Sequence, residues 1–183
     1  MKFKKNKAFA IRHTRWVVAI TIAAFLLSVF MSFFSEILLD NAGRFVSFVI
    51  LISIILLGIF FDIIGVAVTV ADERPFHSMA SAKVKSAASS LLLIRNASKV
   101  SNFCNDVIGD ICGIISGTSA AFIVIKMEHY YPFIDMAIVS VILSGLIASL
   151  TIGGKAVGKE LAISYAKEIV TVVGKFLSLF NRK

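Results

Sequence analysis

The sequence predicts an all-α integral membrane protein with four transmembrane helices. Of its 183 residues, 58% are hydrophobic and 16% are charged, whereas soluble domains average about 45–50% and about 25%. The mean hydropathy is +0.90, which excludes a disordered chain. A helix needs roughly 20 apolar residues to span a bilayer core. Four runs approach this length, at about residues 16–34, 45–71, 103–125 and 136–154.

The net charge of the chain is +8, and the segments that flank these runs are alternately basic and acidic. The first 15 residues contribute +6 and the connections 35–44, 72–101 and 126–135 contribute −1, +3 and −1, while residues 155–183 contribute +4. This alternation follows the positive-inside rule for four spans with both termini in the cytoplasm. The basic residues flank membrane spans instead of gathering on one folded face, so nucleic-acid binding is not expected.

The first span is predicted to be an uncleaved signal anchor. Trp16 to Phe34 contains 19 uncharged residues, which is longer than the apolar core of a signal peptide, about 7–15 residues. No A-x-A cleavage site follows it. Cleavage is the alternative interpretation.

The pattern divides the chain into three regions. We expect a basic cytoplasmic N-terminus at 1–15, a four-helix transmembrane domain at 16–154 and an amphipathic basic cytoplasmic tail at 155–183. Within the second region, residues 76–99 combine apolar residues at helical spacing with basic residues on other sides, which predicts an amphipathic helix in the cytoplasmic interface. The tail carries a similar apolar stripe. It is expected either to lie on the membrane or to pack on the interfacial helix.

Three aspartates lie inside the apolar runs, where each costs about 2.5–3.5 kcal/mol at a helix centre. Asp106 and Asp110 are spaced i,i+4 and so share one face of the third run, with Asn105 adjacent, while Asp62 is expected at a similar depth. Oxygen ligands of this kind suit Mg²⁺. They also suit a proton relay or hydrogen-bonded packing, and these alternatives stay open.

Small residues form two rows at spacings of four. Such rows let membrane helices approach closely, either within one chain or in a homodimer. The rows are Gly109, Gly113 and Gly117 in the third run, and Gly145, Ser149 and Gly153 in the fourth. Motifs of catalysis are lacking: there is no G-x-x-x-x-G-K-[ST] and no G-x-S-x-G, so neither a nucleotide-driven pump nor another enzyme is expected.

Four short motifs occur in a familiar order. The second run contains FFDIIG at 60–65, a leucine-rich stretch ends in LIRNASKV at 93–100, the third run opens with Asn105 and Asp106, and the fourth ends in GKAVGK at 154–159. Over about residues 55–165 this order resembles the transmembrane domain of the CorB/CorC and cyclin-M family of magnesium transporters. That family has FFSxxE, an asparagine-rich turn and GE-x-x-PK at these places. Asp62 therefore replaces a serine, Gly65 and Lys155 replace glutamates, and Gly158 replaces the proline.

The resemblance implies a magnesium site between the helices, open to the cytoplasm, in a homodimer. Asp62, Asn105 and Asp106 stand at the matching positions, and Asp110 is added because of its shared face. The expected function is a transporter or binding protein for divalent cations, with Mg²⁺ as the transported ion. The alternative is a non-transporting membrane scaffold or accessory subunit. The expected location is the bacterial plasma membrane, and the family's regulatory CBS pair is not expected in this chain.

Overall fold

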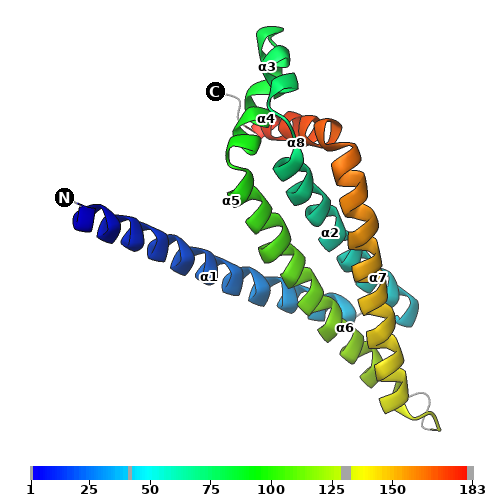
Figure 1. Ribbon diagram of the computed structural model, residues 1–183. Coiled ribbons are helices and arrows are strands. Elements are labelled where there is room, and N and C mark those ends of the chain that lie inside the picture. Colours follow the sequence, from blue (N-terminus) through cyan, green and yellow to red (C-terminus); the bar gives the residue numbers. More distant parts are fainter. Residues whose placement is uncertain (1, 41–42, 129–132, 181–183) are drawn as a thin grey trace.

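The structure, a computed structural model, describes residues 2–40, 43–128 and 133–180, and the regular secondary structure in these ranges is helical (Figure 1). The elements are α1 (Lys2–Asp40), α2 (Arg44–Val70), α3 (Arg74–Ser81), α4 (Lys85–Arg95), α5 (Ala97–Ser101), the π-helix η1 (Asn102–Gly109), α6 (Asp110–Glu128), α7 (Met136–Ser164) and α8 (Ala166–Phe180). The predicted all-α fold is confirmed.

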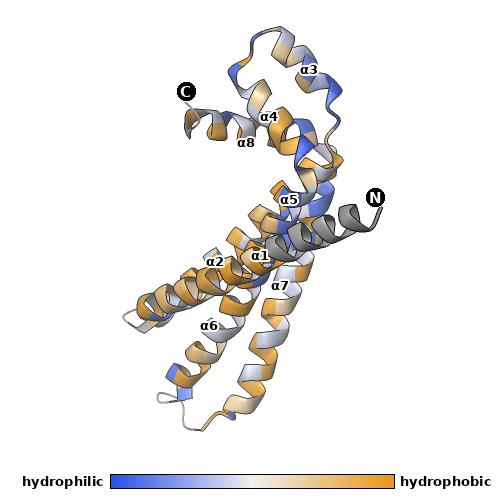
Figure 2. Ribbon diagram, turned by 90° about the vertical axis from the view of Figure 1, so that its left-hand side faces the viewer, coloured by the Kyte–Doolittle hydropathy of each residue, from blue (hydrophilic) through white to orange (hydrophobic). Residues whose placement is uncertain are grey.

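Four helical stretches are long and apolar enough to cross a membrane, as predicted. They are Val17–Ile37, Phe45–Val70, Ala97–Glu128 and Met136–Ser164. The third joins α5, η1 and α6 into one span. The hydrophobic colouring of Figure 2 follows these four stretches, while hydrophilic residues concentrate near α3 and α4. The chain is therefore suited to be an integral membrane protein.

Helix α2 is the central helix of the bundle, in contact with α6, α7, η1, α5 and α8. Two of its glycines lie where another helix comes closest: a Cβ at Gly58 would stand 2.9 Å from Cys112 Cβ, and one at Gly65 would overlap the Asn105 side chain. Figure 1 shows α1 crossing α6 and leaving the bundle at a wide angle. Its contact surface is a row of apolar side chains, Ile20, Ala24, Leu27 and Met31.

The glycines that bring α7 against α2 differ from those in the predicted rows. A Cβ at Gly154 would collide with Ile59, and one at Gly158 would lie 2.8 Å from Ile63 Cγ1. In the predicted rows, only Gly109 meets another helix. A Cβ would meet nothing within 4 Å at the other four glycines, Gly113, Gly117, Gly145 and Gly153. Of the two alternatives predicted for the rows, the structure shows no packing inside one chain at these four glycines.

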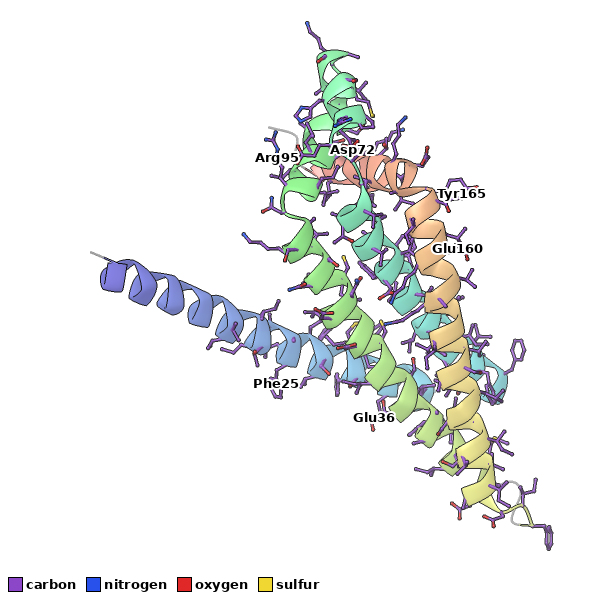
Figure 3. The ribbon with its side chains drawn as sticks, in the orientation of Figure 1. Phe25, Glu36, Asp72, Arg95, Glu160 and Tyr165 are labelled. Atoms are coloured by element: carbon purple, nitrogen blue, oxygen red, sulfur yellow. The ribbon has the colours of Figure 1, made fainter. Side chains whose placement is uncertain are left out.

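The fourth span does not end at residue 154. Helix α7 continues to Ser164, the chain turns at Tyr165, and α8 then runs across one end of the bundle (Figure 3). The expected tail at 155–183 thus begins as a separate helix only at Ala166. Lys155 does not interrupt the span because its ammonium group is paired with an aspartate of α2.

The predicted interfacial helix at 76–99 is divided into α3 and α4, and its last three residues, 97–99, belong to α5 at the start of the third span. Lys83, between α3 and α4, adopts a φ of 57°. The Lys83 N–H donates to the Ala80 carbonyl at 2.9 Å and the Val84 N–H to the Met79 carbonyl at 3.0 Å. This is the Schellman pattern of a helix C-terminus. A lysine in the left-handed position ends α3 although no glycine or proline marks the break.

Helices α4 and α8 pack on each other at this end of the bundle, which we call the α4–α8 end. Phe76 and Ala87 from the predicted interfacial face are fully buried there, as are Ala162 and Val170. Ser90 Oγ donates to the Val170 carbonyl at 3.2 Å. Of the two predicted arrangements of the tail, the structure shows packing on the interfacial segment.

Candidate functional site

Three polar residues lie at matching depths in three adjacent spans. Asp62 is eight residues before Val70 in α2, Lys155 is nine before Ser164 in α7, and Asn105 is eight after Ala97 in the third span. At 1.5 Å of rise per residue, each is about 12–14 Å from the α4–α8 end of its span. Helix α2 packs against both η1 and α7, so the three residues lie in the same region of the bundle.

Asp62 and Lys155 form an ion pair inside the helix bundle. The distance from Lys155 Nζ to Asp62 Oδ1 is 3.6 Å. The Asp62 side chain is 6% exposed and the Lys155 side chain is 25% exposed. A Cβ at Gly109 would lie 3.3 Å from Lys155 Nζ, so this glycine leaves room for the ammonium group. Removing one partner from such a pair leaves an uncompensated charge, which is far more costly than the pair itself.

Asn105 packs over the same face of α2, one turn beyond Asp62. Its Nδ2 donates to Ser101 Oγ at 3.3 Å. Its Oδ1 lies against Gly65, where any side chain would overlap it. The absence of a side chain at position 65 therefore leaves the space that the asparagine occupies.

Two buried oxygen atoms at this face have no hydrogen-bond partner. In the part of the chain that the structure describes, Asp62 Oδ2 and Asn105 Oδ1 are the buried side-chain atoms in this condition. An unsatisfied buried acceptor costs about 1–3 kcal/mol. Two of them on neighbouring helices mark a place where a proton donor or a cation would be stabilised.

Asp106 and Asp110 are not brought into this cluster. Both are exposed, whereas Asp62 is buried. The described residues include no group of three His, Cys, Asp or Glu side chains suited to hold a metal ion. Of the four predicted ligands, Asp62 is buried and Asn105 lies against Gly65, one turn from Asp62 along α2, while Asp106 and Asp110 are exposed.

The π-helix η1 explains part of this result. Residues 102–109 wind with i→i+5 hydrogen bonds instead of the α-helical pattern assumed from the sequence. Cys104, Val107 and Gly109 are the buried residues of η1, so Asp106 stays on the outer side. Single-turn π-helical segments inside longer helices occur frequently at functional sites.

Sequence reasoning missed Lys155 as a member of the cluster. It was assigned to the tail because it follows an uncharged run. A signal was nevertheless present, since a lysine at the depth expected for an intramembrane aspartate is its natural partner. Beside Lys155 the structure leaves a cavity of only ≈ 10 Å³, lined among others by Gly58, Gly109 and Thr151.

No protein-family model matches the chain, and neither a curated protein nor a solved structure matches it. The candidate site is therefore defined by its own geometry: a neutralised Asp–Lys pair, an adjacent amide oxygen, and two buried oxygens without donors.

Proposed function

We propose that this protein binds Mg²⁺ within the membrane and transports it, with oxygen atoms of Asp62 and Asn105 as the protein ligands. The observation that carries the proposal is the pair of unpartnered buried oxygens, Asp62 Oδ2 and Asn105 Oδ1. Mg²⁺ commonly uses one or two carboxylates and keeps several waters, so two protein ligands are sufficient. The resemblance to the CorB/CorC and cyclin-M family supports the choice of ion, because both residues stand at matching positions.

The proposed orientation places the α4–α8 end in the cytoplasm of a bacterial cell, with both chain termini on that side. The support is the excess of basic residues in segments 72–101 and 155–183, as the positive-inside rule requires. The ion would then reach Asp62 from the cytoplasm over about 12–14 Å.

We also propose that the protein is a homodimer. The glycines that meet nothing within the chain, such as Gly113 and Gly153, leave flat helix surfaces of the kind that membrane helices use to associate. The exposed side chain of Ser149 continues the row on α7.

Titration calorimetry of the detergent-purified protein with Mg²⁺ tests the binding. We expect saturable heat in the wild type, loss of that heat in Asp62→Asn and a weaker signal in Asn105→Ala. Asp106→Asn and Asp110→Asn serve as matched controls, because they remove exposed carboxylates from the same span. If these two variants abolish the heat, the exposed aspartates are ligands after all.

Transport is tested in liposomes that contain a fluorescent Mg²⁺ indicator. The wild type should carry Mg²⁺ down an imposed gradient, and Asp62→Asn should not. Folded wild-type protein that gives neither saturable heat nor flux would contradict the proposal.

A non-transporting scaffold or accessory subunit is the second candidate. One observation favours it: Lys155 already neutralises Asp62 within the chain, so the cluster carries no net charge that demands an ion. In that case the wild type and Asp62→Asn would be equally silent in both assays.

A further inference from the structure

We infer that the ammonium group of Lys155 is the resident occupant of the cation site, and that Mg²⁺ binds only after Lys155 has left it. The inference rests on the proposed function and adds how the site is controlled. The inference assigns a role to Lys155, which stands where the family that the chain resembles has a glutamate.

The first argument is charge. Lys155 Nζ lies 3.6 Å from Asp62 Oδ1, so the carboxylate is already balanced by one positive charge. Adding Mg²⁺ with the ammonium in place would set three positive charges against one carboxylate inside a membrane span. A like charge a few ångströms away shifts an ionic equilibrium by about one to three powers of ten. The two cations therefore exclude each other.

The second argument is space. The cavity beside Lys155 measures ≈ 10 Å³ and is lined by neither Asp62 nor Asn105, and it has room for at most about one water molecule. Mg²⁺ usually retains several waters in protein sites. With Lys155 Nζ 3.3 Å from the position of a Cβ on Gly109, the cavity beside the ammonium group is too small for a hydrated ion.

The third argument identifies which partner moves. Lys155 is 25% exposed and Asp62 is 6% exposed. The four-carbon stem of lysine is flexible, so its ammonium group can move away from the carboxylate, whereas Asp62 is enclosed on a packed helix. Lys155 therefore acts as a tethered cation that leaves the site when a divalent ion replaces it.

The test compares Mg²⁺ affinity in the full-length purified protein by calorimetry and by Mg²⁺-dependent thermal stabilisation. We expect Lys155→Met to bind Mg²⁺ about 100-fold more tightly than the wild type, in the middle of the range for a nearby like charge. Lys155→Arg keeps the charge and should show no such gain. Lys159→Met removes an exposed lysine one turn further along α7 and is the matched control.

The outcomes separate this inference from the proposed function. Equal affinity in the wild type and Lys155→Met, with both lost on Asp62→Asn, would overturn the inference and leave the proposed function standing. Absence of binding in both folded proteins would overturn the proposed function and the inference with it. If Lys155→Met does not fold without metal, the same comparison is made with Lys155→Gln, and the absence of tighter binding in that variant counts against the inference.

Discussion

The buried ion pair predicts that its two partners are not equivalent when they are mutated. At 3.6 Å and an effective dielectric constant of about 20, the attraction is about 4–5 kcal/mol. Lys155→Met leaves the Asp62 carboxylate, 6% exposed, without a counter-charge, which costs about 3–5 kcal/mol. Asp62→Asn leaves an ammonium group that is 25% exposed on a flexible stem and is less enclosed than the carboxylate, so we expect a smaller loss of about 1–2 kcal/mol.

The double variant Asp62→Asn/Lys155→Met should recover most of the stability. Replacing both members of a buried pair by neutral groups is often neutral, so we expect the double variant within about 1 kcal/mol of the wild type. For a chain of this size, 1 kcal/mol corresponds to about 2–4 °C in Tm. Lys155→Met should therefore lower Tm by about 10 °C and Asp62→Asn by about 5 °C.

Thermal unfolding of the detergent-purified proteins, followed by circular dichroism in a buffer with a chelator, measures these shifts. The chelator matters because a bound divalent ion would replace the missing ammonium group in Lys155→Met. Equal losses in the two single variants, or a double variant that loses the sum of both, would refute the asymmetric burial on which the reasoning depends.

Three further predictions follow from the packing and the topology. Gly154→Leu should lower Tm because its side chain would collide with Ile59. Gly153→Leu faces open space, so it should leave Tm unchanged and weaken dimerisation, as measured by crosslinking. A larger loss of Tm in Gly153→Leu than in Gly154→Leu would contradict the helix contacts. Lys83→Gly should raise the stability by about 1 kcal/mol, measured by thermal unfolding, because a φ of 57° suits glycine; a lower Tm would show that the lysine side chain is needed there. Reporters inserted near Glu128 and fused after the C-terminus should lie on opposite sides of the membrane, and finding them on one side would contradict four spans.

The four spans were predictable because bilayer thickness fixes their length and hydropathy reports it directly. The predicted end of the fourth span was wrong because the sequence does not show that a lysine is paired with an aspartate of another helix. Lys155 looked like the start of a tail, yet α7 continues to Ser164 and the charge of Lys155 is paired with Asp62 of another helix. Hydropathy counts a paired lysine and a solvated lysine alike.

The candidate site was half predictable for a related reason. Asp62 and Asn105 were found because polar groups inside apolar runs need partners. Asp106 and Asp110 are both exposed, and their i,i+4 spacing predicts a shared face but not whether that face packs against α2. The end of α3 at Lys83 was equally hidden, because a left-handed lysine has no marker in the sequence.

The distance between Asp62 and Lys155 along the chain has a consequence for biosynthesis. The two residues are about 90 positions apart, so at about 5–20 residues per second the aspartate enters the membrane about 5–20 s before its lysine has been made. During that interval the carboxyl group has no lysine partner from α7, and the third span is made before the ion pair can form. Closure of the pair is thus a late event in assembly, and a chain arrested before α7 would expose an unpaired aspartate to quality-control proteases.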